Sequence, residues 1–128
     1  MPSPAEPLRH LTKRSQFLRA ARGNRAGRPA FALQAIGGAA AEPGIGFTVT
    51  KKTGNSPERN RIKRRLRAAA AARADDFSPF HDYVLVGRRE ALSQSFDKML
   101  DDLGYLLRKV HANKAAVRPD QGPTEPRP

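Results

Sequence analysis

A dense cluster of basic residues lies between Lys51 and Arg67, and its residue types and spacing indicate the kind of group that it could bind. The segment RNRIKRRLR, residues 59–67, holds six Lys or Arg, and the segment KKTGN, residues 51–55, closely precedes it. Glu58 is the only acidic residue in this stretch. Basic side chains three or four positions apart on a helix repel one another, and bound phosphate groups would relieve that repulsion. The cluster is therefore predicted to bind a polyanion rather than only to be solvated.

The basic segment is predicted to be a helix with one buried side. Ser56 suits the N-cap, Pro57 suits the first helical position, and Glu58 complements the helix dipole. At ~100° per residue, an apolar stripe is formed by Ile62, Leu66 and Ala69. Arg59 and Arg65 flank that stripe. The residues that point away from it are Asn60, Lys63, Arg64 and Arg67. A disordered tail or import signal needs no such stripe, so an anchored helix is favoured.

The excess of positive charge is confined to the first part of the chain. The 128 residues carry a net charge of +12. Residues 1–72 hold fifteen Lys or Arg against three acidic residues, whereas residues 73–128 hold nine of each sign. One concentrated positive surface indicates RNA, DNA or anionic lipid as the partner. Lipid suits the chain least, because the basic helix lacks the aromatic and leucine-rich face of an interfacial helix.

The composition restricts the class of protein further. The absence of Cys excludes disulfides and thiolate metal sites. No apolar run has the length of a membrane span, and the first residues, MPSPAEPLRHLTKR, lack the apolar core of a secretory signal. We therefore expect one small cytoplasmic domain without a membrane partner.

The predicted order of elements is helix, strands, helix, strand, helix, which makes a small two-layer α+β sandwich. The first helix is expected to begin at Thr12 and stop at Gly23. Alternating apolar residues predict strands over 27–38 and 45–52, and a buried strand is predicted over 82–88. In the strand over 45–52, the side with Gly46, Thr48 and Thr50 is small and polar, so we expect it to be open to a ligand rather than part of the core.

The last helix is predicted to begin near Ser93 or Ser95 and to carry a core stripe. The aromatic residues assigned to the core are Phe47, Phe96 and Tyr105. Residues 1–7 are predicted to be a mobile leader and residues 8–112 the folded domain. Residues 113–128 hold four Pro and no periodicity, which predicts a disordered tail.

The string TVTKKTGNSPERNRIKRRLR resembles the protein subunit of bacterial ribonuclease P, and the resemblance extends over residues 8–110. It implies helices on a four-stranded sheet and a left-handed crossover through the basic helix, against the general rule. It also implies that a catalytic RNA subunit removes the 5′ leader of precursor tRNA by Mg²⁺-dependent hydrolysis, while the protein binds that RNA and the leader. No catalytic residue, metal ligand or cofactor is expected in the protein itself, and DNA is not an expected partner.

The resemblance implies two groups of binding residues. The residues implied for the catalytic RNA are Lys51, Lys52, Asn55, Arg59, Asn60, Arg61, Lys63, Arg64, Arg65 and Arg67. Those implied for the single-stranded leader are Lys13, Arg14, Phe17 and Phe31, because such strands bind where positive charge meets stacking aromatics. The sequence departs from the family at Ala21, where a second aromatic is common, and at Glu58, which has no role in this scheme.

Two other functions compete with this interpretation. One is a structural ribosomal RNA-binding protein, and the other is a nuclease that acts without RNA. The second lacks support, since no group of acidic metal ligands is visible and His10, His81 and His111 stand apart in the sequence.

Overall fold

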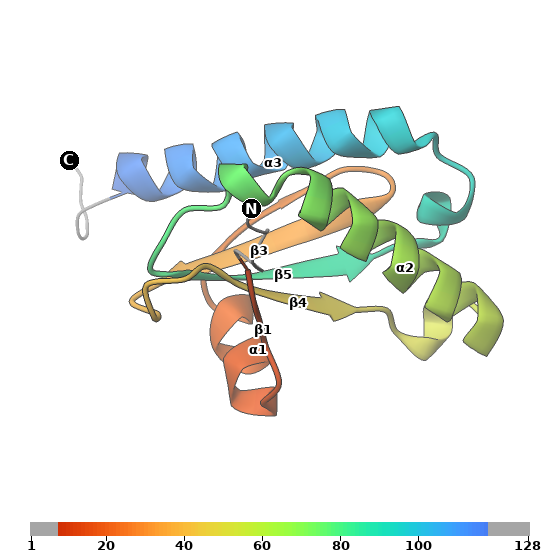
Figure 1. Cartoon of the computed structure of the whole chain (residues 1–128), viewed down its shortest axis with the longest axis horizontal. Helices are drawn as coiled ribbons and strands as arrows, with labels where there is room; N and C mark the ends of the chain where they lie inside the picture. Colours follow the sequence, from red (N-terminus) through yellow and green to blue (C-terminus); the bar gives the residue numbers. More distant parts are fainter. Residues whose placement is uncertain (1–7, 118–128) are drawn as a thin grey trace, which may run out of the picture.

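The computed structural model describes residues 8–117, which form a mixed β-sheet with helices on both faces (Figure 1). The strands are β1 (Arg9–His10), β2 (Asn24–Gly27), β3 (Phe31–Gly37), β4 (Gly44–Thr48) and β5 (His81–Gly87). The α-helices are α1 (Arg14–Ala21), α2 (Ser56–Ala72) and α3 (Phe96–Val117). Three 3₁₀ turns complete the chain: η1 (Lys51–Thr53), η2 (Ala74–Asp76) and η3 (Arg89–Leu92). The predicted α+β class is confirmed.

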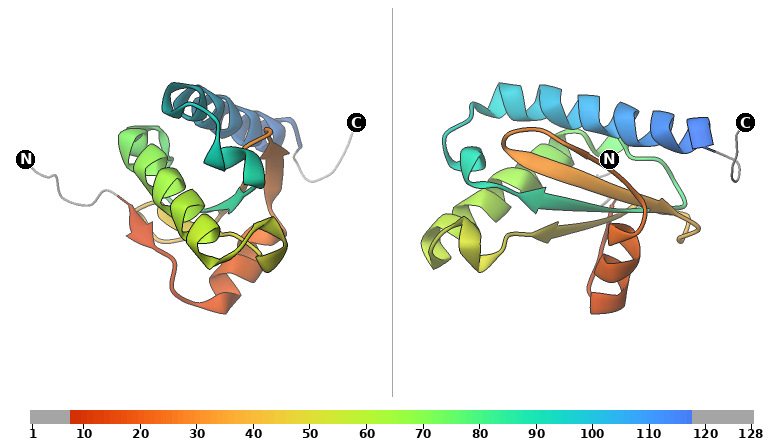
Figure 2. Two further views of the ribbon diagram at one scale, coloured as in Figure 1. Left: turned by 90° about the vertical axis from the view of Figure 1, so that its right-hand side faces the viewer. Right: turned by 180° about the vertical axis from the view of Figure 1, so that it is seen from behind.

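The sheet has five strands in the order β1-β4-β5-β3-β2, so the expected number of four is wrong. The two strands that the residue pattern did not predict are short: β1 pairs parallel to β4 over two residues, and β2 forms a hairpin with β3. The sequence analysis did not predict β2, because β2 has too few apolar residues to show an alternating pattern. Strands β4 and β5 are parallel neighbours joined through α2, and Figures 1 and 2 show this crossover to be left-handed.

Helix α1 covers one face of the sheet, and α2 and α3 cover the other (Figure 2). The larger core lies beneath α2 and α3, where Ile62 and Leu66 of α2 are fully buried, as the helical wheel predicts. A smaller apolar cluster lies beneath α1 and contains Leu11, Ala20 and Val84, with Phe17 packed against it. Successive residues of a strand point to opposite faces, so each central strand contributes side chains to both layers.

The first helix is shorter than predicted, and it begins after Lys13 rather than after Thr12. The reason is the side chain of Gln16, whose Oε1 accepts hydrogen bonds from the backbone amides of Thr12 (2.9 Å) and Lys13 (3.0 Å). The predicted second strand also ends early, at Thr48. The amide of Thr53 donates to the Thr50 carbonyl at 3.0 Å, which turns Lys51–Thr53 into η1.

Helix α3 packs one side on the sheet and leaves two predicted core aromatics at the surface. Phe96 is 38% exposed and Tyr105 is 40% exposed, so their assignment to the core is wrong. The residues that α3 buries are Met99, Leu103, Leu106, Leu107 and Val110. Their spacing of three and four positions defines a stripe that Tyr105 does not share. Phe47, by contrast, packs against the larger core.

The helical backbone of α3 continues to Val117. The predicted leader at residues 1–7 and most of the predicted tail lie outside the described residues. Within residues 8–117, no helix is long and apolar enough to cross a membrane.

Candidate nucleic-acid interface

The start of α2 is fixed by a reciprocal pair of hydrogen bonds between Asn55 and Glu58. The Glu58 amide donates to Asn55 Oδ1 at 3.0 Å, and the Asn55 amide donates to Glu58 Oε1 at 2.9 Å. This capping box satisfies two amides that the helix start would otherwise leave unpaired. Asn55, rather than Ser56, is therefore the N-cap, and its side chain holds the helix start.

Glu58 is turned toward the protein and forms a two-point ion pair with Arg89 of η3. Arg89 Nη2 lies 2.8 Å from Glu58 Oε2, and Arg89 Nη1 lies 3.1 Å from Glu58 Oε1. The Arg89 guanidinium and the Asn55 amide hold the pKa of the Glu58 carboxyl at about 2. The carboxylate is therefore ionised at neutral pH, and its charge is balanced by the Arg89 guanidinium. This ion pair explains how an acidic residue is accommodated in a basic segment.

The outward side of η1 and α2 presents basic side chains that lack an internal partner. Lys51, Lys52, Arg61 and Arg64 are exposed, and Lys63 is half-buried. Within residues 8–117, none of the five forms an ion pair or a side-chain hydrogen bond. We call these five residues the docking surface. Unpaired cations held on a rigid helix and its preceding turn are suited to contact successive phosphates.

Two further residues of the predicted set border the docking surface. Arg67 is exposed, and its guanidinium lies 5.4 Å from the centre of the Phe47 ring, a cation–π contact that orients the side chain along the sheet. Asn60 is exposed on the same helix, as the wheel predicts.

Arg65 and Arg59 differ from their neighbours, because the protein itself occupies their guanidinium groups. Arg65 donates to the carbonyls of Ala91 (2.8 Å), Leu92 (3.3 Å) and Gln94 (2.6 Å), and so fastens η3 to α2. Arg59 donates to the Ser56 hydroxyl at 2.9 Å and to the Gly54 carbonyl at 3.4 Å. These contacts give both residues an intramolecular role that their predicted part in RNA binding did not include.

A second surface lies where α1 meets the sheet. Phe17 is half-buried there and lies over Gly46 of β4, so close that a Cβ at Gly46 would be 2.6 Å from the Phe17 ring. The strand register places Gly46 beside Val84, Val84 beside Gln34, and Gln34 beside Arg25 on this face. We call this surface the α1 face. Gly46 is buried beneath Phe17, so the prediction that this side of β4 is open to a ligand is wrong at Gly46. Lys13 and Arg14 are exposed at the start of α1.

Phe31 does not lie on the α1 face. Its side chain is fully buried in the larger core on the opposite side of the sheet, together with Leu33 and Ala35. A ring with no exposed surface has no face on which a base can stack, so the prediction of Phe31 as a leader contact is wrong. Alternation along the strand correctly separated Phe31 from Gln34, but it did not show which side α1 would cover.

The sequence comparisons agree with this geometry. The family Ribonuclease P matches residues 6–111 of the chain. The "Ribonuclease P protein component" of Ruegeria pomeroyi is 49% identical over 109 residues, which cover 81% of this chain and 87% of the relative. The chain belongs to the ribonuclease P protein family. The relative of the same name from Brucella suis is 35% identical over 128 residues, with 88% of this chain and 91% of the relative covered.

Solved structures support the fold. The ribonuclease P protein of Thermotoga maritima superposes with a TM-score of 0.69 at 21% identity and covers 79% of this chain and 96% of its own. The ribonuclease P protein of Staphylococcus aureus gives a TM-score of 0.63 at 21% identity, with coverages of 78% and 93%. These likenesses show that the chain shares the fold of those proteins.

The α1 face of this ribonuclease P protein includes two arginines that the sequence analysis missed. Arg25 is exposed, and it faces α1 because its neighbour Ala26 packs into the opposite core. Arg88 follows β5, and its guanidinium lies 3.1 Å from where a Cβ of Gly27 would stand, while Nη1 donates to the Arg28 carbonyl at 2.9 Å. Recognition of β2 as a strand would have placed Arg25 on this face.

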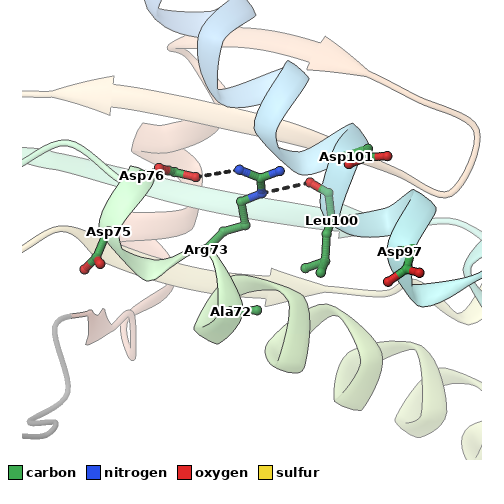
Figure 3. Close-up of a pocket in the computed structure, with 7 residues that line it drawn as sticks. All are labelled: Ala72, Arg73, Asp75, Asp76, Asp97, Leu100 and Asp101. Carbon is green, nitrogen blue, oxygen red and sulfur yellow. Dashed lines mark hydrogen bonds and ion pairs between the residues drawn. The ribbon is translucent and has the colours of Figure 1, made fainter.

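The opposite end of α2 carries the reverse charge (Figure 3). A pocket between the C-terminal end of α2 and the start of α3 is lined by Ala72, Arg73, Asp75, Asp76, Asp97, Leu100 and Asp101. Arg73 is held within it by Asp76 (2.9 Å) and by the Leu100 carbonyl (3.0 Å). Among the described residues, no cluster of His, Asp or Glu has the arrangement of a metal site. The carboxylates would repel phosphate, so RNA is expected at the other end of the helix.

Proposed function

We propose that this ribonuclease P protein is a noncatalytic component that binds the catalytic RNA of the enzyme through the docking surface. The observation that carries the proposal is the set of five basic side chains without internal partners on η1 and α2. The fold does not neutralise their charge, because the nearby Glu58 carboxylate is engaged in its ion pair with Arg89. Uncompensated positive charge of this density binds a polyanion by releasing its counterions.

We further propose that the single-stranded 5′ leader of precursor tRNA binds along the α1 face. Phe17 offers a partly exposed ring there, with Lys13 and Arg14 at the start of the same helix. Arg25 and Arg88 add positive charge on the same face of the sheet as Phe17. A ring for stacking combined with cations for the backbone is the arrangement that single strands bind.

The hydrolysis itself is assigned to the RNA, which would bring its own Mg²⁺ ions to stabilise the charge that develops on phosphate. The carboxylates nearest the basic regions are engaged in structural ion pairs, Glu58 with Arg89 and Asp82 with Arg9 at 2.7 Å. Those side chains are therefore poorly placed to collect a metal beside a bound phosphate. The protein would act in the cytoplasm, where precursor tRNA is made.

The test is cleavage of precursor tRNA by the cognate RNA subunit over a series of Mg²⁺ concentrations, with and without the protein. We expect the protein to lower the Mg²⁺ concentration needed for half-maximal cleavage, and the protein without RNA to cleave nothing. An unchanged Mg²⁺ requirement would contradict the proposal. Sequencing of RNA that copurifies with the protein provides an independent check, because a ribosomal protein would bring ribosomal RNA instead.

A further inference from the structure

We propose that Glu58 and Arg89 act together as positioning residues, which hold residues 51–54 and the start of α2 in the arrangement that docks RNA. This inference rests on the proposed function, and it concerns two residues that lie beside the docking surface rather than in it. Both side chains take part in contacts that join three separate segments: η1, the first turn of α2, and η3.

The guanidinium of Arg89 is the centre of this arrangement. Besides its two contacts with Glu58, Nη1 donates to the carbonyl of Thr53 at 3.1 Å. Thr53 is the last residue of η1, which carries Lys51 and Lys52. One planar group therefore ties the lysine-bearing turn and the basic helix to the same point on η3. A fork of this geometry is available to Arg and not to Lys, whose ammonium is a single point charge.

Gly54 provides the space that this ion pair needs. A Cβ at Gly54 would lie 2.6 Å from Glu58 Oε1 and 3.0 Å from Arg89 Nη1. The backbone at Gly54 has φ of 170°, which is extended and open to any residue. Glycine is thus required here for the room beside the ion pair, not for an unusual backbone conformation.

Turn η3 is rigid enough to serve as an anchor because it is attached to α2 a second time. Arg65 donates to the carbonyls of Ala91 and Leu92 at the far end of the same turn, and to the carbonyl of Gln94 just after it. Glu58 and Arg65 are seven residues apart, which is about two helical turns, so both project from one side of α2. The docking residue Arg64 projects about 120° away from Glu58 around the helix, and Arg61 lies between the two directions. The contacts that Glu58 and Arg65 make with the protein would thus fix the orientation of the docking residues on α2.

Substitution of Glu58 separates this role from simple electrostatics, because the two make opposite predictions. If Glu58 only subtracted charge from the docking surface, E58Q would add one net positive charge and strengthen RNA binding. If it positions the segment, E58Q weakens binding despite the added charge. Gln retains an oxygen that can accept from the Asn55 amide, so the capping box is preserved. It lacks the second oxygen that receives Arg89 Nη2.

The experiment compares E58Q, R89K and the control E90Q in binding to the cognate ribonuclease P RNA subunit. R89K keeps the net charge and removes the fork, whereas E90Q removes an exposed carboxylate of η3 that forms no hydrogen bond or ion pair with the described residues. We expect E58Q and R89K each to bind roughly threefold to tenfold more weakly than the parent, the range for coupled neighbouring groups. E90Q should bind equally or more tightly. Binding by E58Q that equals or exceeds that of E90Q would overturn the proposal.

Hydrogen exchange in the protein without RNA distinguishes failure of this inference from failure of the proposed function. The amide of Thr53, bonded to the Thr50 carbonyl at 3.0 Å, reports on the order of η1. We expect faster exchange at Thr53 in E58Q and R89K and unchanged exchange in E90Q. If the parent protein does not bind the RNA subunit, the proposed function fails. If hydrogen exchange at Thr53 is unchanged in E58Q, the positioning role is refuted, whatever the result for RNA binding.

Discussion

Arg64 and Arg65 are adjacent in sequence, and the structure predicts opposite consequences for their replacement by Ala. Arg64 is exposed and makes no hydrogen bond or ion pair within residues 8–117, so R64A should leave the free energy of unfolding unchanged. If Arg64 contacts one phosphate, the slope of log K against log salt should fall in magnitude by ~0.7–0.9. Over a fourfold rise in salt, the parent would then lose about threefold more affinity than R64A does.

Arg65 should behave in the reverse way. R65A removes three hydrogen bonds from a half-buried guanidinium, two to carbonyls of η3 and one to the carbonyl of Gln94 just after it. Hydrogen bonds from charged donors contribute ~1.5–3 kcal/mol each where solvent is excluded, and partial exposure reduces the expected total to about 2–3 kcal/mol. That loss would lower the Tm of a domain of this size by roughly 10 °C. The salt slope, measured at a temperature where both variants are folded, should stay close to that of the parent.

Thermal denaturation and RNA titrations at several salt concentrations would decide the matter, with the parent and R64A/R65A measured alongside. Because the two effects have different origins, the double variant should show both changes at nearly their full size. A reduced salt slope in R65A with no loss of stability would refute our assignment of Arg65 to the interior contacts. An unchanged slope in R64A would mean that this side chain faces solvent in the complex.

Three other substitutions test the remaining parts of the structure. Ile62→Asp should unfold the domain, as measured by loss of the circular dichroism of α2 and α3, because it places an unpaired charge in the fully buried core. F17A should weaken binding of precursor tRNA that carries a leader but not of mature tRNA, whereas F31A should cost about 3–5 kcal/mol of stability without that selectivity. The depressed pKa of Glu58, about 2 against an ordinary 4.5, makes its stabilising contribution present above pH 4.5 and lost as the pH falls toward 2. Acid titrations of stability should therefore differ between the parent and E58Q in that range.

The sequence was sufficient to predict α2 because all of its signals are local. The spacing of Ile62 and Leu66 depends only on residues within the helix, and both side chains are buried as the wheel predicts. The helix begins one residue earlier than predicted, because Asn55 rather than Ser56 is the N-cap. The same wheel could not distinguish Arg64 from Arg65, since the difference arises from carbonyls of η3 that are 26 to 29 residues away along the chain. Local periodicity identifies which side of a helix is buried, but not which polar residues at its margin find a partner.

The sequence pattern also could not predict which helix covers which face of the sheet, because that depends on contacts between segments far apart in the chain. Alternation along β3 correctly divided Phe31 from Gln34, yet both faces of this sheet are covered by helices, and the pattern does not say which helix covers which face. Phe31 is fully buried beneath the large helices, and the ring that remains accessible is Phe17. Arg25 was missed for a related reason, because only the observed pairing with Gln34 shows that residues 24–27 form a strand.

The distribution of charge along α2 restricts how RNA can approach the protein. With 17 residues at ~1.5 Å each, the helix is about 25 Å long, so its two ends are well separated on the molecular surface. The docking surface lies at its N-terminal half, where the helix dipole is also positive. The pocket at its other end is lined by four Asp residues. The fixed charges and the dipole therefore act in the same direction, and an RNA phosphate backbone that lies along α2 is attracted at one end and repelled at the other. Under the proposed function, this polarity would orient the protein on its RNA before any specific contact forms, and the proposed positioning of residues 51–54 by Glu58 and Arg89 would matter because those residues lie at the attractive end.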